Sequence, residues 1–165
     1  MELSQAFERV VAEEKNRIFS YALYFLANPQ DAEDITQEVF VKLARKLKTF
    51  GRKSSFRTWL YRITVNTAKD FSRKIATKKV YEAAFVSQQG LNNPSPLRDE
   101  HVEADRLYKS LDTLPEKQKT AVLLVFSEGL THKEAAQVLS CPEATVSWRI
   151  FQAKKRLKKS LEHEI

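Results

Sequence analysis

The sequence predicts an all-α fold, with two small helical domains joined by a flexible linker and a helix-turn-helix in the second domain. Apolar residues recur at helical spacing along most of the chain, and only three of the 165 residues are glycine. One window, from about 80 to 100, interrupts this pattern with Pro94, Pro96 and polar residues, as linkers do. We therefore expect domains at 1–79 and 101–165.

The first domain is expected to hold three helices. Apolar positions at helical spacing predict the first helix over 3–27. Asn28 then acts as a cap and Pro29 as the first residue of a second helix. Acidic residues fill the first turn of that helix, and an apolar stripe follows at every fourth position: Ile35, Val39, Leu43 and Leu47. A loop over 49–55 precedes a third helix from about 56 to 78.

The second domain ends in a pattern typical of a helix-turn-helix over 131–159. Thr131 and Glu134 have the spacing of a capping box. The turn around Ser140 is followed by Pro142, a residue favoured at a helix start. The polar residues of the second helix would then face a major groove. A helical hairpin with a solvated basic tail is the simpler alternative.

Positive charge is concentrated in one block of the chain. The net charge is +7, yet residues 42–79 carry thirteen Lys and Arg and one acidic residue, Asp70. Residues 1–41 carry three basic and eight acidic residues. Because a solvated surface usually mixes the two signs, the block predicts binding to phosphates of a nucleic acid.

Several other kinds of site are disfavoured by the sequence. Cys141 is the only cysteine, and the three histidines lack ligand spacing, so we expect no disulfide, no metal site and no cofactor. No apolar run approaches the length of a membrane span, and the N-terminus lacks the features of a signal peptide. We expect a cytoplasmic location, no direct membrane insertion and no small-molecule substrate.

The segment Phe56–Asn66 places aromatic rings beside cations and ends in an amide. Rings stack on unpaired bases, cations hold phosphates, and an amide pairs with a base edge, so the segment indicates opened or single-stranded DNA. On one helix these side chains cannot all face outward. We expect Leu60 and Ile63 in the core, whereas core packing and base contact are equally favoured for Trp59 and Tyr61.

Three segments in this order resemble the bacterial RNA polymerase sigma factors of the extracytoplasmic-function group, group 4 of the sigma-70 family. Asp31–Phe40 resembles the helix that docks on core polymerase. The stretch from Phe56 to Asp70 resembles the segment that recognises and melts the −10 element. The stretch from Leu114 to Leu157 resembles the domain that reads the −35 element. The chain departs from the family pattern at Ser140 and Trp148.

The resemblance implies a role for residues of each segment. For docking on the β′ clamp of core polymerase it implies Asp31, Asp34, Gln37, Glu38 and Phe40. For contacts to the −10 DNA it implies Arg52, Lys53, Ser54, Phe56, Arg57, Trp59, Tyr61, Arg62, Asn66, Lys69 and Arg73. For contacts to the −35 DNA it implies Thr131, Lys133, Thr145, Ser147, Trp148, Arg149, Gln152 and Lys155.

The function implied is that of a non-enzymatic transcription initiation factor. It would bind core RNA polymerase at the β′ clamp and β flap, direct it to −35/−10 promoters and help open the −10 DNA. An anti-sigma factor, often membrane-bound in this family, would control it. Two alternatives remain at this point: a dimeric regulator that binds duplex DNA through the helix-turn-helix, and a nuclease built on the clustered acids at 31–38.

Overall fold

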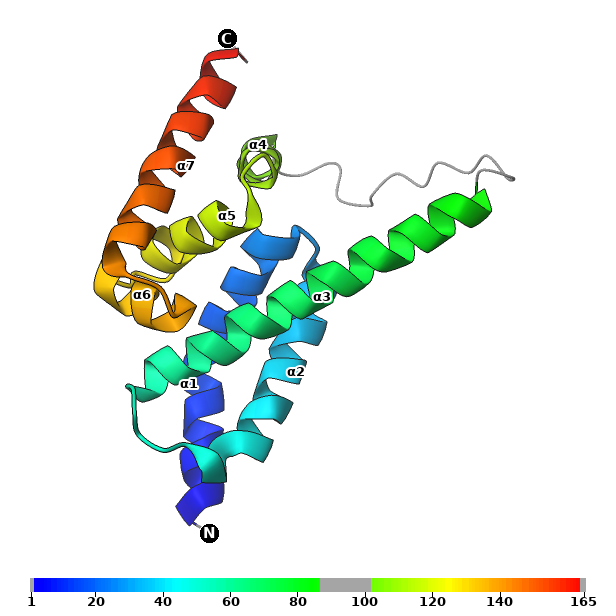
Figure 1. The fold of residues 1–165 in the computed structure, drawn as a ribbon. Helices are drawn as coiled ribbons and strands as arrows, with labels where there is room; N and C mark the ends of the chain where they lie inside the picture. The colour runs from blue at the N-terminus through cyan, green and yellow to red at the C-terminus, as the bar shows by residue number, and fades with distance from the viewer. Residues whose placement is uncertain (1, 87–101, 164–165) are drawn as a thin grey trace.

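The computed structural model describes residues 2–86 and 102–163, and every regular element in these ranges is a helix (Figure 1). The prediction of an all-α fold is confirmed for the described residues. In chain order the elements are α1 (Glu2–Leu26), α2 (Pro29–Lys46), the short 3-10 helix η1 (Leu47–Thr49), α3 (Phe56–Val86), α4 (Val102–Asp112), α5 (Glu116–Val122), the π-helix η2 (Leu123–Ser127), α6 (His132–Leu139) and α7 (Glu143–His163).

Helices α1, α2 and α3 form the first domain around a shared apolar core. The Asn28 side chain accepts a hydrogen bond from the Asp31 backbone N–H at 3.1 Å and so caps α2, and Pro29 is the first residue of that helix, as predicted. Ile35, Val39 and Leu43 of the predicted stripe pack against α1 and α3, whereas Leu47 lies in η1 and is only partly buried. The buried members of this core are Ile18, Ala22, Ala32, Ile35, Val39, Leu43, Leu60 and Ile63.

Helix α3 is longer than predicted. It reaches Val86 instead of ending near 78, and its last turns extend past the other helices (Figure 1). The prediction that the linker begins at 80 is therefore wrong for 80–86, where Ala83 and Ala84 favour helix and no glycine or proline interrupts it. The predicted linker residues 87–100 lie outside the described residues.

The helix-turn-helix has the predicted local chemistry. The Thr131 hydroxyl accepts from the Glu134 backbone N–H at 3.1 Å, and the Glu134 carboxylate accepts from the Thr131 N–H at 3.0 Å, which completes the capping box. Ser140 adopts φ 52°, in the left-handed region, and closes α6 at the turn. Ala135, Val146 and Ile150 are buried where α6 and α7 cross.

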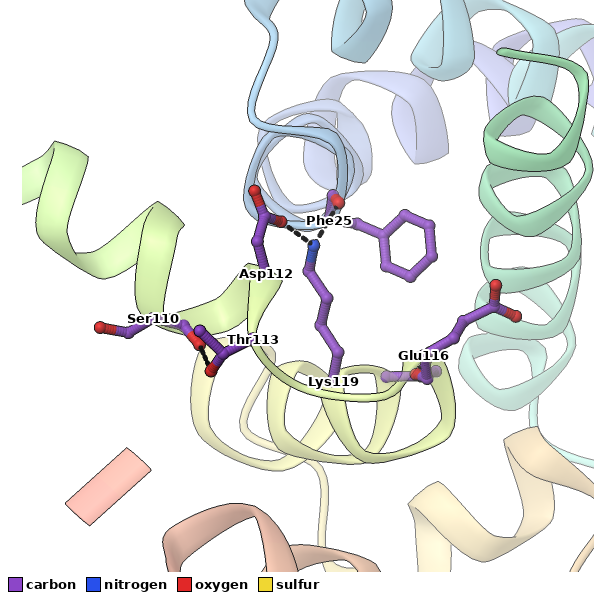
Figure 2. A network of polar contacts seen from close by, with 7 residues as sticks. Phe25, Ser110, Asp112, Thr113, Glu116 and Lys119 are labelled. Atoms are coloured by element: carbon purple, nitrogen blue, oxygen red, sulfur yellow. Dashed lines mark hydrogen bonds and ion pairs between the residues drawn. The ribbon is translucent and has the colours of Figure 1, made fainter. Parts of the chain in front are cut away.

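The two domains pack against each other through a common apolar cluster. Tyr21, Phe25 and Tyr61 of the first domain are buried together with Leu111 and Leu124 of the second. Figure 2 shows a polar contact at the edge of this cluster: Lys119 of α5 donates from Nζ to the Phe25 backbone carbonyl at 2.6 Å and pairs with Asp112 at 2.8 Å. The described parts of the chain thus form one closed arrangement.

Candidate polymerase and nucleic-acid interfaces

A basic hollow lies between α2 and α3. Its volume is about 580 Å³. It gathers five of the residues predicted for −10 DNA and adds others from both helices. The lining residues are Lys42, Lys46, Trp59, Arg62, Ile63, Asn66, Thr67, Lys69, Asp70 and Arg73. Since the lining holds five cations and one carboxylate, the hollow suits an anionic ligand such as a nucleic-acid backbone.

Lys42 and Lys46 of α2 were not predicted as part of this site. Both belong to the basic block 42–79, but the sequence alone does not tell which face of α2 meets α3. Lys42 also has fixed partners: its Nζ lies 3.1 Å from a Glu38 carboxylate oxygen and donates to the Thr67 hydroxyl at 3.2 Å. It therefore connects the predicted docking helix to α3.

Three aromatic rings gather where the loop over 50–55 meets α3. The ring centroids of Phe50 and Trp59 are 4.7 Å apart, and Phe56 lies 5.9 Å from each of them. All three rings are only partly buried. Phe50 was not predicted, although its position just before the basic loop was a usable signal. The group offers a stacking surface beside the basic hollow.

The loop that precedes α3 presents its cations to solvent. Arg52 and Lys53 are exposed, and Arg52 has φ 54°, in the left-handed region. Ser54 is partly buried and donates to the Ser55 carbonyl at 3.3 Å. Ser55 then caps α3, accepting from the Thr58 backbone N–H at 3.1 Å. The cap fixes where the helix begins and leaves the loop before it accessible.

Tyr61 lies in the core, which decides between the two alternatives left open for it. Its side chain is 0% exposed, and its hydroxyl donates to a Glu128 carboxylate oxygen at 2.7 Å. Burial raises the pKa of Tyr61 above its ordinary value. In this arrangement no surface of the Tyr61 ring is accessible for the predicted DNA contact.

Arg57 and Arg62, both predicted for −10 DNA, reach the second domain in this arrangement. Arg57 donates to the Glu128 backbone carbonyl at 2.7 Å, and Arg62 donates twice to the Gln137 carbonyl, at 2.9 and 2.7 Å. Glu128, whose backbone carbonyl accepts from Arg57, is 7% exposed, and burial raises the pKa of its carboxyl. These hydrogen bonds occupy donors of both guanidinium groups, and opening of the contact between the domains would free these donors for a phosphate.

The predicted docking residues fall into two groups. Asp34 and Gln37 are exposed, and Glu38 is partly exposed, so these three form a polar stripe on α2. Phe40 packs partly buried against the first domain's core, and Asp31 sits in the capped first turn. Val41, which is 49% exposed, lies beside the stripe and was not predicted. Exposed polar groups around one apolar residue suit a protein surface.

The predicted −35 residues lie on the outer side of the helix-turn-helix. Lys133, Ser147, Trp148 and Lys155 are exposed, whereas Thr145, Arg149 and Gln152 are partly buried. The remaining residue, Thr131, is exposed but its hydroxyl serves the capping box. Ser147 is held at 2.8 Å from His132 Nδ1.

An aromatic pair stands out on this polar surface. Trp148 is 60% exposed and stacks on Phe151 with ring centroids 5.7 Å apart, and Lys155 lies over the Phe151 ring at 4.9 Å. Phe151 was not predicted; it is 49% exposed and directly follows the buried Ile150. The pair adds apolar area to the surface that would enter a groove.

Two kinds of site are absent from the part of the chain that the structure describes. No group of three or more His, Cys, Asp or Glu side chains is arranged to hold a metal ion. No described helix is long and apolar enough to cross a membrane.

Comparison with known proteins identifies both domains. Residues 10–77 match the family model for Sigma-70 region 2, and residues 104–157 match the model for Sigma-70, region 4. The RNA polymerase sigma-H factor of Pseudomonas aeruginosa is 35% identical over 170 residues, covering 96% of this chain and 87% of that protein. The ECF RNA polymerase sigma-E factor of Escherichia coli (strain K12) is 31% identical, covering 93% of this chain and 85% of that protein.

Solved structures share the fold over nearly the whole chain. CnrH, in its complex with the cytosolic domain of CnrY, superposes with a TM-score of 0.78 at 25% identity, covering 98% of this chain and 91% of that chain. The sigma factor RpoE of Bartonella quintana, in complex with the anti-sigma factor NepR, gives a TM-score of 0.72 at 22% identity, covering 96% and 98%. Since the two family models cover most of the chain and relatives above 30% identity span nearly all of it, the chain belongs to the extracytoplasmic-function group of the sigma-70 family of RNA polymerase sigma factors.

Proposed function

We propose that this transcription initiation factor directs core RNA polymerase to −35/−10 promoters and helps to open the −10 DNA. The observation that supports this best is the basic hollow with Asn66 on its wall and an aromatic group at its edge. Binding of intact duplex needs the cations but has little use for the rings, whereas an opened strand uses both. Residues 1–79 would dock on polymerase and read the −10 element, and 101–165 would read the −35 element.

The opening step would rely on the loop before α3 and the rings beside it. Flipping a base out of the duplex costs a few kcal/mol, which stacking and hydrogen bonds in a pocket can offset. Phe50, Phe56 and Trp59 offer the stacking area, and exposed Arg52 and Lys53 can hold the flanking phosphates. Asn66 on the adjacent helix is the proposed contact to a base edge.

Docking on core polymerase would use the exposed stripe of α2. Asp34, Gln37 and Glu38 would meet a basic surface of the β′ clamp, with Val41 as the apolar contact. A pull-down would test this with Asp34→Arg, which places a like charge against that surface. Glu13→Arg is the matched control, because Glu13 is also exposed but lies on α1 instead of α2. Equal loss of polymerase binding in both variants would argue against docking through the polar stripe.

An anti-sigma factor is the proposed regulatory partner. RpoE, a chain of the same fold, is held in a complex with the anti-sigma factor NepR. The cytoplasm is the proposed location, since core polymerase and promoter DNA are the proposed partners. Co-purification of the chain from its own cells, with identification of bound proteins, would test for this regulator.

Run-off transcription with purified core polymerase is the decisive test of the proposed function. We expect promoter-dependent transcripts and permanganate-reactive thymines in the −10 region only when core polymerase and this chain are both present. A duplex-binding regulator would instead shift promoter DNA tightly without core polymerase. That result, together with the absence of promoter-dependent initiation, would overturn the proposal.

A further inference from the structure

The outward face of α7 is centred on an aromatic side chain. Val146 and Ile150 are buried, at 0% and 3% exposure, and mark the side of the helix that packs on the rest of its domain. Trp148 lies two residues from each of them, about 200° around the helix in either direction, and is therefore nearly opposite the buried side. It is 60% exposed. If α7 enters a major groove as a recognition helix does, Trp148 points toward the base edges.

The indole of Trp148 is supported by a second ring on the next turn. It stacks on Phe151 with ring centroids 5.7 Å apart and ring planes 28° from parallel. Lys155 in turn lies 4.9 Å from the centroid of the Phe151 ring. Stacking of this kind favours one placement of the two rings over others. Ala144, one turn before Trp148, is small and exposed, so it leaves room beside the indole.

The charges around this aromatic pair favour DNA as its partner. The two carboxylates of α7, Glu143 and Glu162, lie near opposite ends of the helix. A group of cations, all exposed, follows directly after the aromatic pair: Lys154, Lys155, Arg156, Lys158 and Lys159. Cations at this density suit the phosphates that flank a groove, which would place the rings over the base edges between them.

The base edges in a major groove offer one apolar feature. Guanine, adenine and cytosine present hydrogen-bond donors and acceptors there, whereas thymine also presents its C5-methyl group. Burial of one methyl group against the indole corresponds to about a fourfold gain in affinity. A base edge without the methyl group offers the ring no such gain, so an exposed indole at the centre of the reading face selects thymine.

We propose that Trp148 is a specificity-determining residue for the −35 element, with its indole on the C5-methyl group of a thymine and Phe151 supporting the indole. This inference rests on the proposed function, and it names the base feature that the helix-turn-helix would select.

Removal of single methyl groups from the −35 element provides the test. The preferred promoter is first identified by transcription in vitro with the holoenzyme. Each thymine of its −35 element, on either strand, is then replaced by deoxyuridine, which lacks only the methyl group. We expect at least one replacement to weaken binding of wild-type holoenzyme about fourfold. Holoenzyme with Trp148→Ala should bind the thymine and deoxyuridine fragments equally.

A matched variant and a second pair of fragments sharpen this test. Leu161→Ala truncates another exposed apolar residue of α7 and should discriminate against deoxyuridine as wild type does. Cytosine and 5-methylcytosine, placed at the sensitive position and paired with guanine, also differ only in the methyl group. Wild-type holoenzyme should prefer the methylated fragment by about fourfold, and Trp148→Ala should show no preference.

A forked fragment with the −10 element but no −35 element shows whether the variant is folded and assembled. Trp148→Ala holoenzyme should bind this fragment as tightly as wild type does. Equal losses on fragments with and without the −35 element would assign the aromatic pair to a protein partner and overturn the inference. Persistence of the methyl effect in Trp148→Ala, its absence in wild type, or a preferred −35 element without thymine would also overturn it.

Failure of this inference is distinguishable from failure of the proposed function. If wild-type holoenzyme initiates from a −35/−10 promoter but does not respond to the methyl groups, only the role of Trp148 is refuted. If wild-type holoenzyme neither binds promoter fragments nor initiates, the proposed function fails and the inference fails with it.

Discussion

The Tyr61 hydroxyl donates a hydrogen bond of 2.7 Å to the Glu128 carboxylate, from α3 of the first domain to the segment that follows η2 in the second. Both groups are buried, at 0% and 7% exposure. The other carboxylate oxygen accepts from the Ser127 hydroxyl at 3.1 Å. A buried carboxylate with donors on both oxygens makes the closed arrangement of the two domains depend on specific partners.

Tyr61→Phe should destabilise the chain by about 1.5–3 kcal/mol, because it removes a hydrogen bond to a buried charged group and leaves one carboxylate oxygen without its donor. Urea unfolding measures the change. Tyr81→Phe is the control, since Tyr81 is 68% exposed and should change stability by less than about 0.5 kcal/mol. Equal stability of Tyr61→Phe and wild type would show that the hydroxyl contributes nothing.

Glu128 should make stability depend on pH. Burial raises its pKa against the opposing effects of Tyr61, Ser127, Arg17 and Arg57. Above the ordinary value of 4.5 the unfolded chain has lost the proton while the folded chain keeps it, so stability falls as pH rises from there through the raised pKa.

The Glu128→Gln side chain cannot ionise, so this variant should lack the loss of stability with rising pH that Glu128 causes. We expect wild type, relative to the variant, to be more stable at pH 4 than at pH 7. Chemical denaturation of both proteins across this range gives the difference. For Glu82→Gln, at an exposed position, the difference from wild type should stay flat. A flat difference for Glu128→Gln as well would contradict the prediction.

Lys119 makes another polar contact between the domains, at the C-terminal end of α1 (Figure 2). Its side chain is 9% exposed, and its Nζ donates to the Phe25 carbonyl, one of the last carbonyls of α1 and without a partner in the helix. Lys119→Met keeps most of the apolar packing but leaves that carbonyl unpaired, so we expect a loss of about 1–3 kcal/mol in urea unfolding.

Two control variants separate this effect from simple loss of charge. Lys117→Met changes an exposed lysine of the same helix and should cost less than about 0.5 kcal/mol. Asp112→Asn should cost less than Lys119→Met, because the Asp112 side chain is 60% exposed and asparagine keeps a side-chain oxygen that can accept from Lys119. A larger effect of Asp112→Asn than of Lys119→Met would place the main contribution in the ion pair.

Local features of the fold were predictable because neighbouring residues decide them. Asn28 caps α2, and Thr131 and Glu134 form the capping box, as the sequence indicated. The end of α3 was not predictable from composition. Polar residues suggested a linker from 80, but helix propensity continues through Ala83 and Ala84.

The candidate sites were less predictable because they depend on contacts between segments distant in sequence. Lys42 and Lys46 join the basic hollow only through the packing of α2 on α3. Tyr61 has an aromatic ring that could stack on a base. In the core, however, its hydroxyl donates a hydrogen bond to a carboxylate 67 residues further along the chain. Patterns within one helix contain no information about such partners.

Asn66 and Lys69 both line the basic hollow, but substitutions of these two residues should weaken DNA binding in different ways. Asn66→Ala removes a proposed base contact, so we expect a loss of about 1–3 kcal/mol in binding to the preferred −10 sequence and a weaker preference at one base. Lys69→Gln removes a phosphate contact, so holoenzyme affinity should fall for all −10 sequences alike, with a salt slope smaller by about 1. Affinity of each holoenzyme for single-base variants of the −10 strand, measured at several salt concentrations, separates the two results. A uniform loss for Asn66→Ala would assign this side chain to the DNA backbone and leave base recognition to the aromatic group.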